Sequence, residues 1–298
     1  MKTTDMLIAV VVLVTIISVV CIWFYPSVQD FMAANTLWNG VRDFSHESGA
    51  QNIDSLDELP ALPEEKTLLS IPTLAYSDEE LIRIRDFVSH GGRLVLMDDY
   101  GYGNQVLEAL GLDVRFTNIP LLDPLFCYKS PWLPKIMDFA PELGENGVEM
   151  VVLNHATCLQ DVAESEVLAW SSGSSFLDFD ESETRTRDEP RGPFPVAAKM
   201  KCGKGTVVLV SDPSILINSM ARRGDNRSFA AYLVGPGVEE GEVLVDRSSL
   251  AKAQLDESKV GLVSLRRALS EPYPLLGLVV IVFAVASKYT LKKGERFD

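Results

Sequence analysis

The chain has few of the residues that most often build a catalytic or metal centre. Its 298 residues include four cysteines and three histidines, and no two cysteines form a CxxC pair. A zinc ribbon and a thioredoxin-type redox site are therefore not supported. Apart from Cys21, which lies in an apolar run, the cysteines are an odd number at wide spacing. These three cysteines could form one disulfide and leave one free thiol, or could all be buried thiols.

Basic residues are also scarce, with 27 Lys and Arg against 42 Asp and Glu, a net charge of −15 and a pI near 4.7. Nucleic-acid-binding proteins need a basic face for the phosphate backbone, so this class is excluded. The mean hydropathy is nonetheless positive, at +0.11. Apolar residues are therefore concentrated, and they lie mainly at the two ends of the chain.

The first apolar run extends from Met6 to Tyr25 without a charge, which is the length that a helix needs to cross a bilayer. It predicts a transmembrane helix over residues 6–25, after a short tail at 1–5. The alternative is a cleaved signal peptide with a cut near Ala33 and Ala34. Against it, the run is too long and its basic start, Lys2 alone, is too weak.

The second run, residues 273–290, predicts another span, with a buried core helix as the alternative. Four basic residues at and after its end outnumber the two before it, which places the tail at 291–298 in the cytoplasm. Two spans then put both termini in the cytoplasm and residues 26–272 on the extracytoplasmic face of the cell membrane. There, 22 basic and 39 acidic residues give a net charge of −17.

Between the spans, strand and helix patterns alternate. The clearest local signal is a capping box of Ser77 and Glu80, which opens a helix. The predicted elements are, in order, a helix from Asn35 to Gly49, a strand at 67–71, a helix from Ser77 to Gly91, a strand at 93–97 and a helix at about 105–110. This order predicts an α/β domain over residues 26–235, with a mostly parallel sheet and helices on both faces.

The second half of the domain continues the pattern. A glycine-containing turn at 201–205 predicts an antiparallel hairpin, and the charged stretch 179–189 predicts a surface loop. The elements are strands at 150–153, 167–170, 196–200 and 207–210, a short helix from Asp212 to Gly224 and a helix from Asp225 to Gly235. Residues 236–272, with a strand at Glu242 to Val245, are interpreted as a connector that returns the chain to the membrane.

Polar residues follow several strands, at the edge where open α/β sheets bind ligands. They are Asp98, Asp99, Asn154, His155, Ser171, Ser172, Ser211 and Asp212. Two close carboxylates there could act as acid and base or bind a divalent cation. The alternative is that these side chains cap helices and turns. A nucleophile is not indicated, because no G-x-[SC]-x-G string occurs and Cys202 falls in the predicted hairpin turn.

Several strings together resemble a known family, the membrane-associated domain of unknown function family 4350, which is common in archaea and in some bacteria. They include FVSHGGRLVLMDDYGYGN (87–104), LNHAT (153–157), GPFPVAA (192–198), GKGTVVLVSDP (203–213) and GDN (224–226). The resemblance covers most of residues 35–235. It implies a flavodoxin-like sheet similar to class I glutamine amidotransferases without their catalytic cysteine, and therefore a pseudoenzyme. Members are often encoded near MoxR-type AAA ATPases and von Willebrand-type proteins, which implies protein partners in a membrane complex.

The resemblance also carries over a candidate ligand-binding pocket, because the family's recurrent polar positions have counterparts in this chain. These positions are Asp98, Asp99, Gly101, Asn104, Asn154, Asp212, Asn218, Gly224, Asp225 and Asn226. No cofactor is predicted, although the carboxylates are compatible with a divalent cation. Asn226 also begins a glycosylation sequon, which the predicted topology would expose to modification.

We therefore expect a membrane-anchored, non-catalytic domain that binds a ligand or a protein partner outside the membrane. One alternative is a hydrolase that uses a carboxylate pair, with or without a metal, on an external substrate. Another is a purely structural subunit with an exposed apolar patch. Asp98 or Asp99 close to Asp212 or Asp225 around an open cavity would favour the hydrolase, whereas side chains turned back to cap helices would favour the binding domain.

Overall fold

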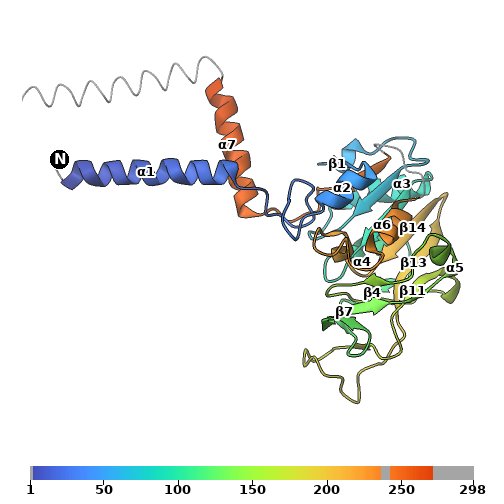
Figure 1. Cartoon of the computed structure of the whole chain (residues 1–298). Coiled ribbons are helices and arrows are strands. Elements are labelled where there is room, and N and C mark those ends of the chain that lie inside the picture. Colours follow the sequence, from blue (N-terminus) through green and yellow to red (C-terminus); the bar gives the residue numbers. More distant parts are fainter. Residues whose placement is uncertain (1–2, 236–241, 271–298) are drawn as a thin grey trace, which may run out of the picture. The chain divides into compact units, whose positions relative to one another are not determined.

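The computed structural model describes residues 3–235 and 242–270 (Figure 1). The chain divides into two compact units. Residues 26–251 form the α/β domain, and the second unit holds the helices that precede and follow it in sequence.

The second unit contains α1 (Thr3–Phe24) and α7 (Gln254–Ser270). Among residues 3–235 and 242–270, α1 is the one helix long and apolar enough to cross a membrane, over Met6–Phe24. Its apolar side chains are largely exposed, as expected of a helix that faces lipid. The predicted second span at 273–290 and the basic tail at 291–298 lie outside the described residues, so the double-pass arrangement stays a prediction.

An eight-stranded sheet forms the centre of the α/β domain, in the order β1-β15-β2-β3-β14-β13-β11-β8. The strands from β1 to β14 in this order are parallel, and β13, β11 and β8 continue the sheet antiparallel. They are β1 (Gln51–Ile53), β15 (Val243–Asp246), β2 (Thr67–Ser70), β3 (Arg93–Met97), β14 (Gly205–Val210), β13 (Pro195–Cys202), β11 (Val167–Trp170) and β8 (Asp138–Phe139). The predicted α/β class and the β13–β14 hairpin are confirmed.

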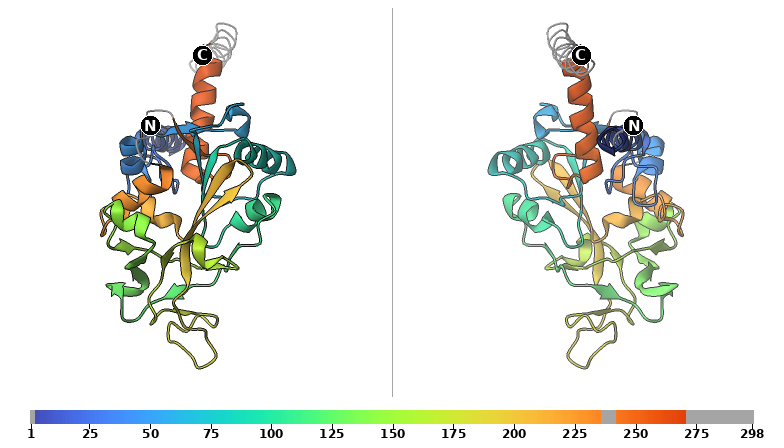
Figure 2. Two further views of the ribbon diagram at one scale, coloured as in Figure 1. Left: turned by 90° about the vertical axis from the view of Figure 1, so that its right-hand side faces the viewer. Right: turned by 90° about the vertical axis from the view of Figure 1, so that its left-hand side faces the viewer.

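Helices cover both faces of this sheet (Figure 2). Leu94 and Leu96 of β3 face a core shared with α3 and α4, whereas Val95 and Met97 face a core shared with α2 and α6. The pleat of a strand dictates this alternation, and burial of both faces explains why β3 is apolar from Leu94 to Met97. The helices are α2 (Arg42–Ser48), α3 (Asp78–Ser89), α4 (Gly103–Ala109), α5 (Pro141–Glu145) and α6 (Asn226–Val234), with 3-10 turns η1 (Leu56–Glu58), η2 (Glu164–Glu166) and η3 (Pro213–Leu216).

The remaining strands form three small sheets. They are β4 (Arg115–Phe116), β5 (Leu121–Leu122), β6 (Cys127–Tyr128), β7 (Ser130–Ile136), β9 (Val151–Val152), β10 (Leu159–Gln160) and β12 (Phe176–Leu177). The strand predicted at 150–153 is β9, and it pairs with β7 instead of joining the central sheet.

Three further elements differ from their predictions. The strand assigned to the connector is β15, which pairs on both sides, with β1 and β2, inside the sheet. The helix predicted from Asn35 forms only as α2, although it ends at Gly49 in the left-handed conformation that glycine favours. The segment after Asp212 forms the short turn η3 instead of a helix that reaches Gly224.

Candidate functional site

Asp98, directly after β3, turns back onto its own chain. It is 3% exposed, and its two carboxylate oxygens accept hydrogen bonds from the backbone N–H groups of Gly101 (2.7 Å) and Gly103 (2.6 Å). A Cβ at Gly101 would lie 2.4 Å from the carbonyl oxygen of Pro72, so only glycine fits there. Burial raises the pKa of Asp98 to about 6, although the backbone donors oppose this. Asp98 therefore shapes the loop that opens α4.

Both carboxylate oxygens of Asp212, after β14, also accept hydrogen bonds from backbone N–H groups. Its oxygens accept from Ser214 N (2.7 Å) at the start of η3 and from Asn154 N (2.6 Å). The side chain is fully buried, and burial raises its pKa to about 8. Asn154 joins this arrangement through its backbone. Asn104 pairs in the same manner with the backbone of Phe116, donating to its carbonyl (2.9 Å) and accepting from its N–H (2.8 Å).

The side chains of Asp225 and Asn226 also form hydrogen bonds to backbone groups, here in and just before β9. Asp225 accepts from the N–H groups of Glu149 and Met150, each at 2.9 Å. The amide of Asn226 accepts from Val152 N (2.8 Å) and donates to Val152 O (2.9 Å). Asp212 bonds in the same way to the backbone N–H of Asn154. Three side chains thus form hydrogen bonds to the backbone of residues 149–154, as a neighbouring strand would do in a sheet.

The Asn226 side chain is fully buried, and its amide nitrogen also donates to Met220 O at 3.0 Å. The folded chain therefore does not present the sequon for glycosylation, contrary to the prediction. Asn218 lies elsewhere and braces the loop before α2, donating to Leu37 O (2.6 Å) and accepting from Asp43 N (3.1 Å). The predicted pocket residues thus bind separate stretches of backbone, and among them Asn226 also lines the pocket between α2, η3 and α6.

Asp99 is the strand-edge carboxylate that stays partly accessible. Burial raises its pKa, and the nearby His155 opposes the shift. The His155 ring stacks on Trp132, with centroids 4.5 Å apart, and the Tyr100 hydroxyl donates to Ala156 O. The partly exposed part of this edge is thus one carboxylate beside aromatic rings.

A further strand-edge cluster was missed by the sequence analysis. Asp246, at the end of β15, accepts a hydrogen bond from the Tyr76 hydroxyl, which also contacts Ser70 (2.7 Å) and Ser249 (2.9 Å). All four residues are buried. Burial and the Asp246 charge hold the pKa of Tyr76 well above its usual range. This network fills the carboxyl end of β15 and β2 with the chain's own side chains.

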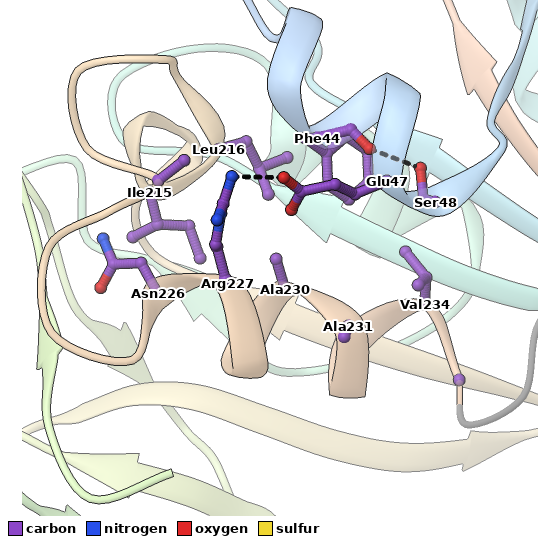
Figure 3. Close-up of a pocket in the computed structure, with 12 residues that line it drawn as sticks. Phe44, Glu47, Ser48, Ile215, Leu216, Asn226, Arg227, Ala230, Ala231 and Val234 are labelled. Atoms are coloured by element: carbon purple, nitrogen blue, oxygen red, sulfur yellow. Dashed lines mark hydrogen bonds and ion pairs between the residues drawn. The ribbon is translucent and has the colours of Figure 1, made fainter. Parts of the chain in front are cut away.

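An apolar pocket lies between α2, η3 and α6 (Figure 3). Its volume is about 250 Å³, and its apolar walls come mainly from Phe44, Ile215, Leu216, Ala230 and Val234. Small alanines on the pocket side of α6 leave the space open. The spacing of Arg227, Ala230, Ala231 and Val234 at i, i+3, i+4 and i+7 is the sequence signal that could have indicated this face.

Charged groups of this pocket lie at one side, where Arg227 of α6 reaches Glu47 of α2 (Figure 3). Both side chains are 45% exposed. An ion pair in this setting contributes little stability, because water competes for both partners. Its partners can therefore exchange for the polar group of a ligand at small cost.

The charged stretch 179–189 forms a largely exposed loop, as predicted. Two carboxylates at its ends bond to the loop's own backbone: Asp178 accepts from Ser182 N and Glu183 N (3.1 Å each), and Glu189 accepts from Phe179 N (2.9 Å) and Thr186 N (2.7 Å). Asp178 and Glu189 are 1% and 4% exposed. Together with Asp180, they bring one carboxylate oxygen each within 4.8 Å of one another. This is the one group of three or more potential ligands of this kind within the described part of the chain, and the strand-end carboxylates are not in it.

The loop also has a regular spacing of oxygen donors. Counted from Asp178, positions 1, 3, 5, 7, 9 and 12 are Asp178, Asp180, Ser182, Thr184, Thr186 and Glu189. Twelve-residue calcium loops carry donors at these positions and glycine at the sixth. The sixth residue here is Glu183, whose φ of 58° is the left-handed conformation that glycine supplies. This spacing is readable in the sequence, although the charge of the stretch alone indicates only a surface loop.

The chain belongs to the family described as domain of unknown function DUF4350, which it matches over residues 33–234. A comparison with curated proteins finds no match.

Several solved structures are similar at low identity. The N-terminal domain of mmIFT52 has a TM-score of 0.48 at 13% identity, covering 63% of this chain and 84% of that one. Cytoplasmic protein STM1381 from Salmonella typhimurium LT2 has a TM-score of 0.39 at 16% identity, covering 63% and 78%. A β-galactosidase from Bacillus circulans sp. alkalophilus has a TM-score of 0.35 at 16% identity, covering 57% of this chain and 23% of the enzyme. These values carry no argument about function.

Proposed function

We propose that this DUF4350 protein is a membrane-anchored, non-catalytic binding protein, and that its ligand site is the pocket between α2 and α6. The pocket carries the proposal, because it is a preformed apolar cavity of about 250 Å³ with a solvent-accessible ion pair beside it. Ligand sites typically combine apolar walls with a few polar groups that fix orientation.

The carboxyl edge of the sheet is the edge where β3 and β14 end, beside Asp98 and Asp212. The hydrogen bonds of these residues favour a binding protein over a hydrolase. A carboxylate pair that acts on a substrate needs both groups open to the reacting atoms. Asp98 and Asp212 are instead buried and each accepts two backbone N–H groups. The charge of Asp99 does act on Asp212, but Asp212 is fully buried, so this pair lacks a second carboxyl group open to a substrate.

The pocket suggests the size and chemistry of the ligand. A cavity of about 150 Å³ holds benzene, so this one suits an apolar group somewhat larger than a single ring. A carboxylate on the ligand would replace Glu47 as the partner of Arg227, which offers a planar pair of donors. The positive end of the α6 dipole adds to this preference. The proposed ligand is a small aromatic or aliphatic acid.

Calorimetric titration of the full chain in detergent with 3-phenylpropionate, and with the matched alcohol 3-phenylpropanol, tests this proposal. We expect the acid to bind at least about fivefold more tightly than the alcohol, since the Arg227 hydrogen bond is charge-assisted. Ala230→Leu should abolish binding by filling the cavity. Ser228→Leu adds a similar side chain to an exposed position of the same helix and should not. Equal binding by both variants, or none by the native chain, would refute the pocket assignment.

We also propose the double-pass topology, with spans at 6–25 and 273–290 and the acidic domain outside. The apolar, exposed α1 supports the first span, and the charge asymmetry of the sequence supports the orientation. In sealed cells, a membrane-impermeant maleimide should label Ser182→Cys, whereas Thr4→Cys should react only after lysis. The native chain gives the background of its own cysteines. Labelling of Thr4→Cys in sealed cells would reverse the orientation.

The same topology would allow the domain to serve as a subunit of a membrane complex with a MoxR-type ATPase and von Willebrand-type partners. A purely structural subunit remains the competing proposal, and it predicts no ligand for the α2–α6 pocket. The amidotransferase-like fold without a catalytic cysteine is likewise a proposal that rests on the sequence resemblance.

A second proposed activity is calcium binding by residues 178–189, favoured by the twelve-residue spacing of oxygen donors. Glu189→Gln removes the carboxylate at position 12 and should weaken binding at least about tenfold. Glu181→Gln makes the same change at position 4, which donates no ligand, and should stay within about twofold. Calcium titration of the full chain measures both. Absence of binding to the native chain, or equal weakening by both variants, would contradict this assignment.

A further inference from the structure

A second cavity, of about 470 Å³, lies at the opposite edge of the sheet from Asp98 and Asp212. Its lining includes Arg93 at the start of β3 and Thr206 near the start of β14, whereas Asp98 and Asp212 follow the ends of these strands. Lys199 and Lys201 of β13 and Glu166 of η2 complete the charged lining. Neither the α2–α6 pocket nor the loop at 178–189 shares a residue with this cavity.

Strand register gathers the basic residues on one face. Arg93 is paired with Thr206, and Thr206 with Lys201, across three adjacent strands. Residues directly opposite one another in neighbouring strands project to the same face, and Lys199 shares that face because it is two residues from Lys201. The face is the one covered by α6, since Arg93 Nη1 donates to Leu233 O at 3.1 Å.

The three basic side chains, Arg93, Lys199 and Lys201, differ in whether an acidic side chain pairs with them. Lys199 forms an ion pair with Glu142 at 2.6 Å and contacts the Tyr232 hydroxyl at 2.9 Å. Neither Arg93 nor Lys201 forms an ion pair with any residue in the described ranges; Lys201 donates only to the Thr206 hydroxyl, at 3.1 Å. Burial lowers the pKa of Arg93, and the nearby Tyr232 and Glu142 oppose this shift.

This arrangement is unusual in a chain whose net charge is −15. Three basic side chains and a hydroxyl converge on one cavity, where Glu166 is the one carboxylate of the lining. Arginine and lysine donors grouped in this manner match the oxygens of phosphate or carboxylate groups. We propose that this cavity binds a small molecule that carries such an oxyanion, independently of the function proposed for the α2–α6 pocket.

Titration calorimetry of the full chain in detergent, with inorganic phosphate and with citrate as separate probes, tests the proposal and separates the two oxyanions. Lys201→Ala should weaken binding of the preferred probe at least about tenfold, because it removes a charge-assisted hydrogen bond to the probe. Lys204→Ala is the matched control: it removes the same charge from the exposed hairpin turn, outside the cavity lining, and should change affinity less than about twofold.

Glu166→Gln gives an independent readout in the opposite direction. It keeps the size of the side chain but removes the negative charge that would repel a bound anion, so it should tighten binding severalfold. The proposal is overturned if neither probe binds the native chain, if Lys204→Ala weakens binding as much as Lys201→Ala, or if Glu166→Gln has no effect. The α2–α6 pocket variant Ala230→Leu should bind the probe normally, so the two proposals fail separately.

Discussion

The carboxyl edge of the sheet and the α2–α6 pocket use polar side chains in opposite ways. At the edge, Asp98 and Asp212 are buried and each accepts two backbone N–H groups. At the pocket, Glu47 and Arg227 are half exposed and contact each other beside an apolar space. Asp98 and Asp212 therefore hold the chain's own backbone, whereas the charged pair beside the pocket that we propose as a ligand site is open to water.

The largest expected effect is on the buried side. Asn226→Ala removes three hydrogen bonds and leaves the N–H and C=O groups of Val152 without their side-chain partner. We expect the free energy of unfolding to fall by about 3 kcal/mol, since each stranded buried group costs about 1 kcal/mol or more. Urea denaturation measures this loss. Ser228→Ala, exposed on the same helix, should change stability by less than about 0.5 kcal/mol. A similar small loss for Asn226→Ala would mean that its amide does not hold β9.

The next effect is a pH dependence that belongs to the carboxyl edge. The pKa of Asp212 is raised to about 8 in the folded chain, above the ordinary value of 3.8. The folded state thus keeps a proton that the unfolded state releases, so the stability is fully present below about pH 4 and is lost as the pH rises towards about 8. Asp98 adds the same trend up to about pH 6.

We expect Asp212→Asn to flatten this decline by about 2 kcal/mol between about pH 6 and about pH 8, beyond its constant loss of one hydrogen bond. Denaturation at both pH values gives the difference. An unchanged slope in the variant would assign the pH dependence to other groups.

The smallest effect on stability should come from the ion pair of the pocket. Arg227→Gln leaves Glu47 in contact with water, and we expect a change of about 0.5 kcal/mol or less in the free energy of unfolding. The same variant should reduce the preference for 3-phenylpropionate over 3-phenylpropanol to nearly none. A large loss of stability would mean that the Arg227–Glu47 pair stabilises the fold, as Asp98 and Asp212 do. The two regions would then not differ in how they use polar side chains.

Local sequence signals predicted the elements whose causes are local. The capping box is formed as expected, with Glu80 N bonded to Ser77 Oγ and Ser77 N bonded to the Glu80 carboxylate. The strand at 93–97 has the predicted bounds, because a charged residue and a pair of aspartates delimit its apolar run. The hairpin at 202–205 follows from the turn between two β-rich segments.

The site could be predicted less well, because a side chain's partner is decided by distant residues. Asp212 and Asn154 are 58 residues apart, and Asn226 and Val152 are 74 apart. The sequence alone does not distinguish a carboxylate that accepts a hydrogen bond from a backbone N–H from one that is free to bind a ligand. The strand at 243–246 was likewise recognised as a strand, but its place between β1 and β2 depends on parallel pairing over a long separation.

The sequence by itself determined an acidic α/β domain of the DUF4350 family, preceded by a helix apolar enough to span a membrane. Composition, periodicity and capping are properties of neighbouring residues, and they do not require the fold to be known. The tertiary structure alone decided that the strand-edge carboxylates are buried against backbone donors, and that α2 and α6 enclose an apolar pocket. Both outcomes depend on packing between distant segments, which sets burial, and burial sets whether a polar group is available to a ligand.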